Sequence, residues 1–415
     1  MARILVVGGS LGGLFVANML HRDGHAVQVL EKVKGSMSGR GAGIVSHDAL
    51  VHALERAGLD RQTTLGVEVP GRVLLDASGQ TKLSCDMPQV LTSWSRLYQM
   101  LRDALPDACY LQGVSVTQVN PSSTDVEVVG LKDGVTTLWQ ADLLIASDGI
   151  RSSIRQQLFP NIQPQYAGYV AWRGVCDESL LSEHTLKTLF DFFGFCVPTD
   201  EQIIGYPVAG SDKNTSRGHR AYNFVWYRPA QGEVLQSLLS DADGVHYPLG
   251  IPPNKVSWRE LAKVREASRH LLAPQFAEIL EKTPQPFLQP IFDVTSEEVT
   301  KGRVALMGDA SFVARPHIGM GVAKAAQDAV ALTDAIRAQG ANAQALEDYA
   351  RTRLPAGRSA VKRAQWLGSF VQSPNGQTPP MAQREHQAIY ETAIDLGRYG
   401  HTSAFQEQLS ATPLG

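Results

Sequence analysis

The chain has 415 residues and a formal net charge of −3, from 38 Lys and Arg against 41 Asp and Glu. Its length fits about two or three domains, and its balanced charge provides no overall basic field for nucleic acid or an anionic membrane surface. We therefore expect small-molecule partners, with neither nucleic acid nor membrane among them.

Neither the cysteines nor the histidines have the spacing of a metal site. The four cysteines, Cys85, Cys109, Cys176 and Cys196, are widely separated, and none of the eleven histidines forms an HExxH or similar pair. The chain enters a strand pattern at MARILVVGG without the features of a signal peptide, and it has no uncharged apolar stretch that could span a bilayer. We expect a reduced, cytoplasmic protein without a bound metal.

The N-terminal elements predict the start of a doubly wound parallel sheet. An apolar run at 3–7 has the length of a strand and is followed by the glycine-rich GGSLGGL, a helical pattern to about Arg22 and a second strand at 26–31. This order of strand, turn, helix and strand is typical of a Rossmann-like domain.

The central part of the chain has a different pattern. Residues 65–92 and 165–230 alternate apolar or aromatic with polar positions and contain frequent Gly and Pro, which indicates an antiparallel sheet inserted into the first domain. Between them, 93–105 has the apolar spacing of a helix with Ser95 as a possible cap, and 141–150 returns to an apolar strand that ends in a turn.

The C-terminal part predicts helices. After an apolar strand at 303–307, an alanine-rich segment places apolar residues along one helical face. A further helix is predicted at 345–371 despite Pro355, and a last helix at 381–397. The fold class is therefore α/β: a Rossmann-like domain, an inserted, mainly antiparallel β-sheet domain, and C-terminal helices.

The glycine-rich segment after the first strand has the form of a dinucleotide-binding turn. In such a turn the first and last glycines, here Gly8 and Gly13, allow the tight turn and the close packing of helix on strand. Ser10 stands where the middle glycine is usual, and its small hydroxyl side chain can donate a hydrogen bond. Glu31, at the end of the second strand, is placed to accept hydrogen bonds from an adenosine ribose. A plain tight turn with Glu31 at a strand edge is the alternative.

A second segment, DGIRSSIR at 148–155, follows the apolar run ADLLIA. Gly149 permits a sharp turn after Asp148, and Ser152 can cap a helix that carries Arg155. Taken alone, this segment is explained equally well as an ordinary helix start with solvated arginines.

A third segment, GDASFVARPHIGMG at 308–321, lies between a predicted strand and a predicted helix. Asp309 stands where the strand ends, Pro316 stiffens the loop, and Gly319 and Gly321 let the backbone pass close to a ligand. The N-terminus of the following helix offers free N–H groups and the positive end of its dipole. Such a turn suits a ligand that carries or gains negative charge.

Together and in this order, the three segments resemble the FAD-dependent aromatic hydroxylases of the para-hydroxybenzoate hydroxylase type, over about residues 1–370. That family combines a GxGxxG-like turn, an internal DGxxSxxR and a distal GD followed by proline and glycines. The resemblance implies that FAD is bound and that NADH or NADPH binds transiently to reduce it. It further implies that O₂ adds at flavin C4a and that the hydroperoxide hydroxylates an electron-rich aromatic ring.

The resemblance also implies roles for particular residues. Asp148 and Arg155 match a motif that contributes to both FAD and nicotinamide binding, and Arg40 and Arg96 match arginines that contact FAD. Solvated side chains are the alternative for both of these arginines. We expect Asp309 to accept a hydrogen bond from a ribityl or ribose hydroxyl, and family habit implies a homodimer.

The family architecture gives expected domain boundaries. The FAD-binding domain is expected to be discontinuous, at 1–72, 93–168 and 286–370. The substrate-binding domain is expected at 73–92 and 169–285, and a C-terminal helical segment at 371–415.

Four blocks of sequence resemble hydroxypyridine hydroxylases within the family: AGYVAWRG at 167–174, IIGYPVAG at 203–210, YNFVWYRP at 222–229 and RPHIGMGVAKAAQDA at 315–329. They favour an N-heteroaromatic substrate over a benzenoid acid. The candidate catalytic residues are His47, His219, Tyr222 and His317, the candidate substrate contacts are Tyr206 and Trp226, and Trp172 and Arg173 are expected near the domain junction. Burial in the core, or a surface position for His317, is the alternative for these side chains.

Other functions remain open at this point. A hydroxylase of phenolic acids or of urate-like purines fits the same motifs. Halogenases share the fold, but their WxWxIP signature is absent from the sequence. A flavin-binding redox sensor without turnover is a further alternative, which the intact DGxxSxxR disfavours because a static binder needs no nicotinamide encounter.

Overall fold

The computed structural model describes residues 1–35, 37, 43–60, 65–210, 214–369, 371 and 379–399. Arg40, the predicted FAD contact, lies outside these described residues. The described residues form a six-stranded, an eight-stranded and a three-stranded sheet.

The six-stranded sheet is parallel except at one edge. Its strands lie in the order β16 (Thr300–Lys301), β17 (Val304–Leu306), β10 (Leu143–Ala146), β1 (Arg3–Val7), β2 (Ala26–Glu31) and β6 (Tyr110–Gln112). All neighbours from β17 to β6 pair in parallel, and β16 pairs antiparallel with β17. The apolar runs of the sequence become its central strands, because a parallel strand covered on both faces buries consecutive side chains.

Helices form one hydrophobic core with this sheet. They are α1 (Leu11–Arg22), α2 (Asp48–Arg56), α3 (Trp94–Ala104), α4 (Ser153–Leu158), α9 (Gly321–Gln339) and α10 (Ala343–Gly368). Helix α1 packs against α3 and α9, and α9 also contacts α2 and α10. The predicted helix at 93–105 is confirmed, but its cap is Ser93, whose hydroxyl accepts from the backbone N–H of Arg96 at 3.3 Å, rather than Ser95.

The eight-stranded sheet is mainly antiparallel and is the inserted sheet. Its order is β15 (Phe287–Asp293), β11 (Gln165–Asp177), β14 (Arg220–Pro229), β13 (Gln202–Ala209), β12 (Phe193–Cys196), β4 (Val67–Leu75), β5 (Thr81–Ser93) and β3 (Gly43–Val45), with β12 and β4 parallel. Because β15 pairs antiparallel with β11, the sheet extends into the expected FAD-binding range. It likewise includes β3 and the start of β4, which precede the expected boundary at 73.

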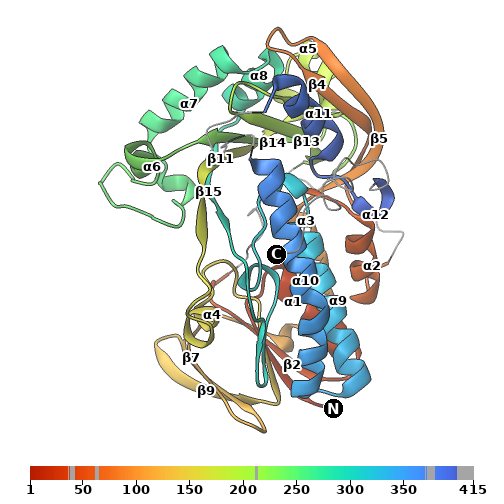
Figure 1. Cartoon of the computed structure of the whole chain (residues 1–415), viewed down its shortest axis with the longest axis vertical. Helices are drawn as coiled ribbons and strands as arrows, with labels where there is room; N and C mark the ends of the chain where they lie inside the picture. The colour runs from red at the N-terminus through yellow and green to blue at the C-terminus, as the bar shows by residue number, and fades with distance from the viewer. Residues whose placement is uncertain are drawn as a thin grey trace.

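Helices pack on both faces of this inserted sheet and beside it. They are α5 (Glu183–Thr185), α6 (Gly232–Leu238), α7 (Trp258–Leu271), α8 (Pro274–Lys282), α11 (Met381–Glu391) and α12 (Leu396–Tyr399). The predicted last helix at 381–397 is interrupted, since α11 ends at Glu391 and Ala393 has a left-handed φ of 52°. Figure 1 shows the inserted sheet with α7 and α8 in the upper half and α1, α9 and α10 in the lower half.

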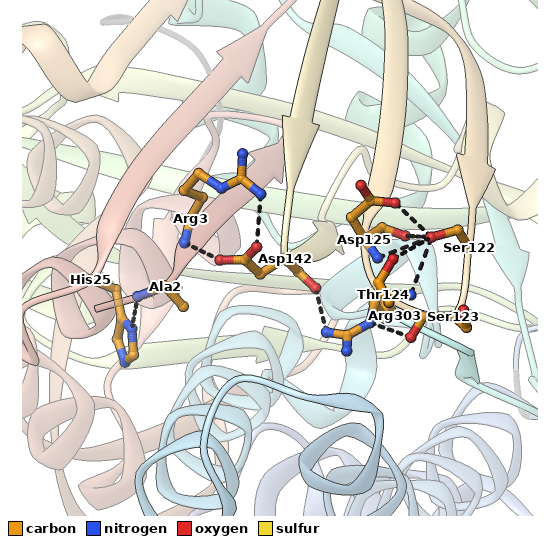
Figure 2. A network of polar contacts seen from close by, with 9 residues as sticks. All are labelled: Ala2, Arg3, His25, Ser122, Ser123, Thr124, Asp125, Asp142 and Arg303. Atoms are coloured by element: carbon orange, nitrogen blue, oxygen red, sulfur yellow. Dashed lines mark hydrogen bonds and ion pairs between the residues drawn. The ribbon is translucent and has the colours of Figure 1, made fainter.

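The three-stranded sheet comprises β7 (Val114–Pro121), β8 (Val126–Lys132) and β9 (Val135–Ala141) and contacts β1 and β2. Asp133 and Gly134 turn between β8 and β9 with φ of 51° and 81°, as a two-residue hairpin requires. Figure 2 shows how its turns are joined to the parallel sheet: Arg3 binds Asp142 at 2.9 Å, and Arg303 donates to the carbonyl oxygens of Ser123 and Asp142.

Candidate active site

The three predicted segments meet at one edge of the parallel sheet. They follow β1, β10 and β17, which are neighbouring parallel strands, so their carboxyl ends lie side by side. Ser147 stands at the centre of this edge: a Cβ on Gly8 would lie 2.3 Å from its carbonyl oxygen, and a Cβ on Gly12 would lie 2.8 Å from its hydroxyl. In open α/β sheets, ligands bind at this edge.

The first turn has the close packing that a dinucleotide-binding turn needs. Gly8 has a φ of 99°, a conformation that favours glycine, and a Cβ on Gly13 would lie 1.9 Å from the Gly8 carbonyl oxygen. Ser10 is the N-terminal flanking residue of α1, and its side chain caps no helical N–H. Its half-buried hydroxyl is therefore available to a phosphate at the helix N-terminus.

Glu31 ends β2 and fixes the first turn. Its buried carboxylate accepts from the N–H of Gly9 at 2.7 Å and from the N–H of Val33 at 2.8 Å. The hydroxyl of Tyr110 donates to the Gly9 carbonyl at 2.9 Å. Each oxygen of Glu31 keeps a second lone pair, so the ribose contact predicted for it stays possible beside this structural role.

The second segment is held by its own side chains and by the third. The predicted cap is confirmed, since the Ser152 hydroxyl accepts from the Arg155 N–H at 2.9 Å. Asp148 accepts from the Ser153 N–H at 2.9 Å through Oδ2, and its buried Oδ1 has no hydrogen-bond partner among the described residues. Burial raises the pKa of the Asp148 carboxyl, and the hydrogen bonds partly offset that rise.

Arg155 ties the second segment to the third. Its side chain is fully buried, and its guanidinium donates to the carbonyl oxygens of Ala310 at 3.0 Å and Ile150 at 2.5 Å. Burial lowers its pKa, against the attraction of Asp148 and Asp309. Because this side chain is fully buried and its guanidinium binds backbone carbonyl groups, the role predicted for it in nicotinamide binding would act through the two loops that it joins.

Asp309 faces the cavity from the third segment. Its side chain is exposed there, and its carboxylate makes no hydrogen bond or ion pair to a described residue. The surrounding loops raise the pKa of this carboxyl by desolvation, while Lys324 lowers it. A carboxylate so placed can accept a hydrogen bond from a ligand hydroxyl.

Buried charges below this turn hold it in place. Lys324 donates to the Gly308 carbonyl at 2.8 Å and pairs with Asp328 at 3.2 Å, and Asp328 also accepts from the Gly308 N–H and from Arg353. The sequence interpretation missed this network. Its signal was a Lys and an Asp four residues apart on the buried face of an alanine-rich helix.

The loop after Asp309 presents backbone to the cavity. Pro316 begins a short 3₁₀ turn, and Gly319 follows with a φ of 63°. A Cβ on Gly321, at the start of α9, would meet nothing within 4 Å. These residues line a cavity of about 270 Å³ that lies between the second and third turns and the inserted sheet.

The inserted sheet forms the opposite wall of this cavity through one face of its strands. The lining residues of that wall and its surroundings include Ile44, Val45, Trp94, Arg173, Ile204, Tyr206, Val225, Tyr227, Gln289 and Pro290. A larger hollow of about 400 Å³ beside Trp172 and Arg228 lies on the other face of the sheet and contains no residue of the three turns. The smaller cavity is therefore the candidate active site.

Strand alternation decides which of the residues predicted on these strands, Tyr206 and Trp226 as substrate contacts and Tyr222 as catalytic, reach the cavity. Tyr206 does, as predicted. Tyr222 and Trp226 do not: they are fully buried with Phe276 in the core on the opposite face. Both were selected from β14, where residues 222, 224 and 226 point away from the cavity and 225 and 227 point toward it.

The three histidines predicted as catalytic do not line the cavity. His219 is exposed in the turn before β14, beyond the end of the cavity wall. His47 is buried behind the third segment, residues 308–321, which we call the flavin loop. Its Nε2 donates to the Gly319 carbonyl at 3.2 Å. Burial lowers the pKa of His47, against the attraction of Asp395.

His317 is turned into the protein rather than toward a reacting centre. Its Nδ1 donates to Gln202 Oε1 at 3.1 Å, its Nε2 accepts from the Tyr169 hydroxyl at 2.9 Å, and its ring lies 4.2 Å from that of Tyr227. Burial, with a smaller contribution from Arg315, lowers its pKa to about 3. It is therefore a neutral link between the flavin loop and the inserted sheet. The prediction missed this because the sequence of a loop does not show which way a side chain points.

Trp94, Asn223 and Tyr227 are site residues that the sequence interpretation did not single out. Trp94 and Tyr227 line the cavity, and Asn223 Oδ1 accepts from the N–H of Gly43, which also lines it. Arg173, expected near the domain junction, lines the cavity as well. For Arg173, Asn223 and Tyr227, the sequence signal was a polar side chain at alternate positions of strands that are otherwise apolar or aromatic.

The C-terminal segment also reaches the cavity. Ala393 belongs to the lining, and its N–H donates to the His317 carbonyl at 2.8 Å. Buried Arg72 of β4 donates to the carbonyl oxygens of Ile389, Thr392 and Ala393 at 2.7–3.1 Å. The described part of the segment expected at 371–415 is thus part of the active-site wall.

The predicted cofactor residues in the described part of the chain fit FAD. The open N-termini of α1 and α9, the free carboxylate of Asp309 and the unpartnered Oδ1 of Asp148 lie along one edge of the parallel sheet. Arg96 is half-buried in the first turn of α3. Among the described residues no cluster suits a metal ion and no helix is long and apolar enough to cross a membrane.

Comparisons with known proteins agree with this geometry. A family model described as FAD binding domain matches residues 1–179 and 252–364, and one described as FAD binding domain-like matches 166–293. The chain is 30% identical over 374 residues to 2,6-dihydroxypyridine 3-monooxygenase of Paenarthrobacter nicotinovorans, covering 89% of this chain and 91% of the relative. It is 26% identical over 373 residues to 6-hydroxynicotinate 3-monooxygenase of Pseudomonas fluorescens, covering 82% and 84%.

A solved structure shows the same fold. The structure of 2,6-dihydroxypyridine-3-hydroxylase from Arthrobacter nicotinovorans has a TM-score of 0.83 and 28% identity, covering 94% of this chain and 96% of that one. The predicted fold class, the FAD cofactor and the use of NAD(P)H and O₂ are confirmed. The chain belongs to the FAD-dependent aromatic hydroxylases of the para-hydroxybenzoate hydroxylase type.

Proposed function

We propose that this enzyme hydroxylates an electron-rich N-heteroaromatic ring, namely a hydroxypyridine, with NAD(P)H and O₂. The observation that carries the proposal is the cavity between Asp309 and the inserted sheet, which combines apolar walls with a few polar groups. Two relatives are named for hydroxylation of hydroxypyridine rings, and they match most of the chain.

The residues of the cavity have separate tasks in this proposal. Asp309 and the backbone at Gly321 hold the cofactor at the edge of the parallel sheet. Ile44, Val45 and Pro290 exclude water from the reacting ring, and the polar groups of the inserted sheet orient it. FAD, when bound, supplies the redox and oxygen chemistry.

The Asp148 and Arg155 segment has a supporting task. It joins the turn after β10 to the turn after β17, so it sets the distance between two parts of the cofactor site. We propose that the transient nicotinamide encounter depends on this segment through the position of those turns.

The test is oxidation of NADH and NADPH by the purified yellow protein with dihydroxypyridines, hydroxynicotinates, urate and hydroxybenzoates, with product mass measured in ¹⁸O₂. We expect a hydroxypyridine to stimulate oxidation and to gain one ¹⁸O. Incorporation only into a hydroxybenzoate or urate would replace the substrate class. Retained FAD without any NAD(P)H oxidation would favour a redox sensor.

A further inference from the structure

Three polar side chains on the cavity face of the inserted sheet have atoms without partners. Arg173 Nε, Asn223 Nδ2 and the Tyr227 hydroxyl are buried, and none of these atoms has a hydrogen-bond partner among the described residues. Burying such donors costs free energy unless a ligand completes them. Their presence in one place therefore indicates a ligand.

Strand register places the three side chains together. Arg173 of β11 pairs with Val225 of β14, so Asn223 and Tyr227 lie two residues to either side on the same face. Tyr206 of β13 pairs with Asn223 and adds a second hydroxyl beside it. The positive charge of Arg173 acts on the hydroxyls of both Tyr206 and Tyr227.

Arg173 carries a positive charge that no described carboxylate pairs. Its guanidinium donates to the neutral Gln289 Oε1 at 2.7 Å, and the one carboxylate among the described lining residues, Asp309, binds no described arginine through its carboxyl group. Arg228, on the same sheet, instead pairs with Glu201 at 2.9 Å. An unpaired guanidinium beside two hydroxyls and an amide N–H₂ group is suited to an anionic oxygen.

The described lining of the same cavity provides no histidine base. No histidine is among its described lining residues, and His47 and His317 both have their ring donors bound to protein acceptors elsewhere. A substrate hydroxyl that must be ionised for ring hydroxylation therefore finds no imidazole to take its proton. A substrate that arrives already ionised needs no such base.

We propose that Arg173, Tyr227 and Asn223 form a subsite for an anionic ring oxygen, so that the enzyme selects hydroxy-N-heteroaromatic compounds in their deprotonated form. This inference rests on the proposed function for its substrate class. Arg173 pairs with the charge, Tyr227 and Asn223 donate hydrogen bonds to the oxygen, and the apolar wall holds the ring. A neutral ring of the same shape leaves the guanidinium buried and unpaired.

The test measures the binding of two pyridine probes to the oxidised holoenzyme. Binding is monitored through the change in the flavin absorbance spectrum in the absence of NAD(P)H. The probes are 2,6-dihydroxypyridine, which can ionise, and 2,6-dimethoxypyridine, which cannot. We expect wild type to prefer the first, and Arg173→Gln to weaken its binding about ten- to hundredfold while changing the second little. Arg173→Lys, which keeps the charge, should restore part of the loss.

Matched variants separate the subsite from general damage to the sheet. Tyr227→Phe removes a cavity hydroxyl and should weaken the dihydroxypyridine severalfold, whereas Tyr222→Phe removes a hydroxyl from the opposite face of the same strand and should not. FAD content and the melting temperature of each variant show whether it is folded. Equal loss in Tyr222→Phe and Tyr227→Phe would overturn the subsite.

The two hypotheses fail in different ways. If wild type hydroxylates a hydroxypyridine but Arg173→Gln binds 2,6-dihydroxypyridine as tightly as wild type, the anion subsite is overturned and the proposed function stands. If no pyridine is hydroxylated yet 2,6-dihydroxypyridine binds through Arg173, the proposed function is overturned and the subsite stands. If wild type binds both probes equally, the selection of an anion is overturned.

Discussion

The two walls of the cavity satisfy their polar groups in different ways. On the side of the three turns, here called the cofactor wall, Asp148 and Ser152 bind backbone N–H groups of their own turn, and Glu31 binds the Gly9 N–H of the neighbouring turn. On the substrate wall, Arg173 and Tyr227 keep donor atoms that no described residue binds. The first wall is organised by the chain itself, whereas the second is completed by what enters the cavity.

The difference shows where rigidity and selectivity reside. Side chains that bind the backbone fix the turns that a cofactor must fit, so their loss should disturb structure and FAD together. Side chains with free donors set which ligand is accepted, so their loss should change affinity and leave the fold intact. Asp309 is an exception on the cofactor wall, because its carboxylate has no described protein partner.

Arg155→Ala should have the largest effect on the cofactor wall. It removes donors to the buried carbonyl oxygens of Ile150 and Ala310, and unsatisfied buried groups of this kind should lower the free energy of unfolding by about 3 kcal/mol. Urea unfolding of the holoprotein measures the loss. The rate of reduction by NAD(P)H, normalised to bound FAD, should also fall.

Arg155→Lys provides the matched control, since it keeps the charge but not the fork of donors. It should lie between wild type and Arg155→Ala in stability. A variant Arg155→Ala with the stability of wild type would contradict the role of Arg155 as a tie between the two turns. Unchanged reduction per bound FAD would remove its predicted link to the nicotinamide encounter.

Asp309→Ala should weaken FAD binding and leave the rest of the cofactor wall intact. Because this carboxylate binds no described residue, its removal should weaken FAD by about thirtyfold, the effect of one hydrogen bond to a charged group, with little change in apoprotein stability. Equilibrium dialysis of FAD measures the first and urea unfolding of the apoprotein the second. Full retention of FAD would sink the assignment of Asp309, and Asp309→Asn should lose less than Asp309→Ala.

The sequence located the turns of the cofactor wall for a physical reason. Its turns follow neighbouring parallel strands, and Asp148 and Ser152 act on backbone only a few positions away, so local spacing carries much of the geometry. The same locality explains why the Ser152 cap was predicted correctly. Buried Lys324 was missed because its partner, the Gly308 carbonyl, depends on how α9 packs below the turn.

The substrate wall depends on long-range pairing, which the sequence does not display. Tyr222 and Tyr227 lie in one block, but only the packing of α7 and α8 against one face of β14 decides that Tyr222 is core and Tyr227 is cavity. His317 belongs to the loop at 308–321, as predicted, yet its ring binds Tyr169 of the inserted sheet, and the ring of His47 binds the Gly319 carbonyl. Spacing placed His317 in its loop but did not give the direction of either ring.

His317 connects the two walls, and the pH dependence of stability that its titration causes tests this connection. Its backbone belongs to the flavin loop, while its ring is hydrogen-bonded to Tyr169 and Gln202 of the inserted sheet. The pKa of about 3 in the folded protein lies below the usual 6.5, so the unfolded chain binds a proton that the folded one excludes. The stabilisation is complete above pH 6.5 and is lost as pH falls from there toward 3.

Between pH 7.5 and 5.5 this linkage should cost the holoprotein about 1.4 kcal/mol of unfolding free energy through His317. His317→Gln keeps a side chain that can bind Tyr169 and Gln202 but does not titrate, so it should be less sensitive to pH by that amount. His47, whose pKa is also lowered by burial, contributes in the same direction in both proteins and cancels in the difference. Urea unfolding of both proteins at the two pH values measures this difference in the free energy of unfolding. Equal pH sensitivity in wild type and variant would show that the His317 ring is not held between the walls as a buried neutral group.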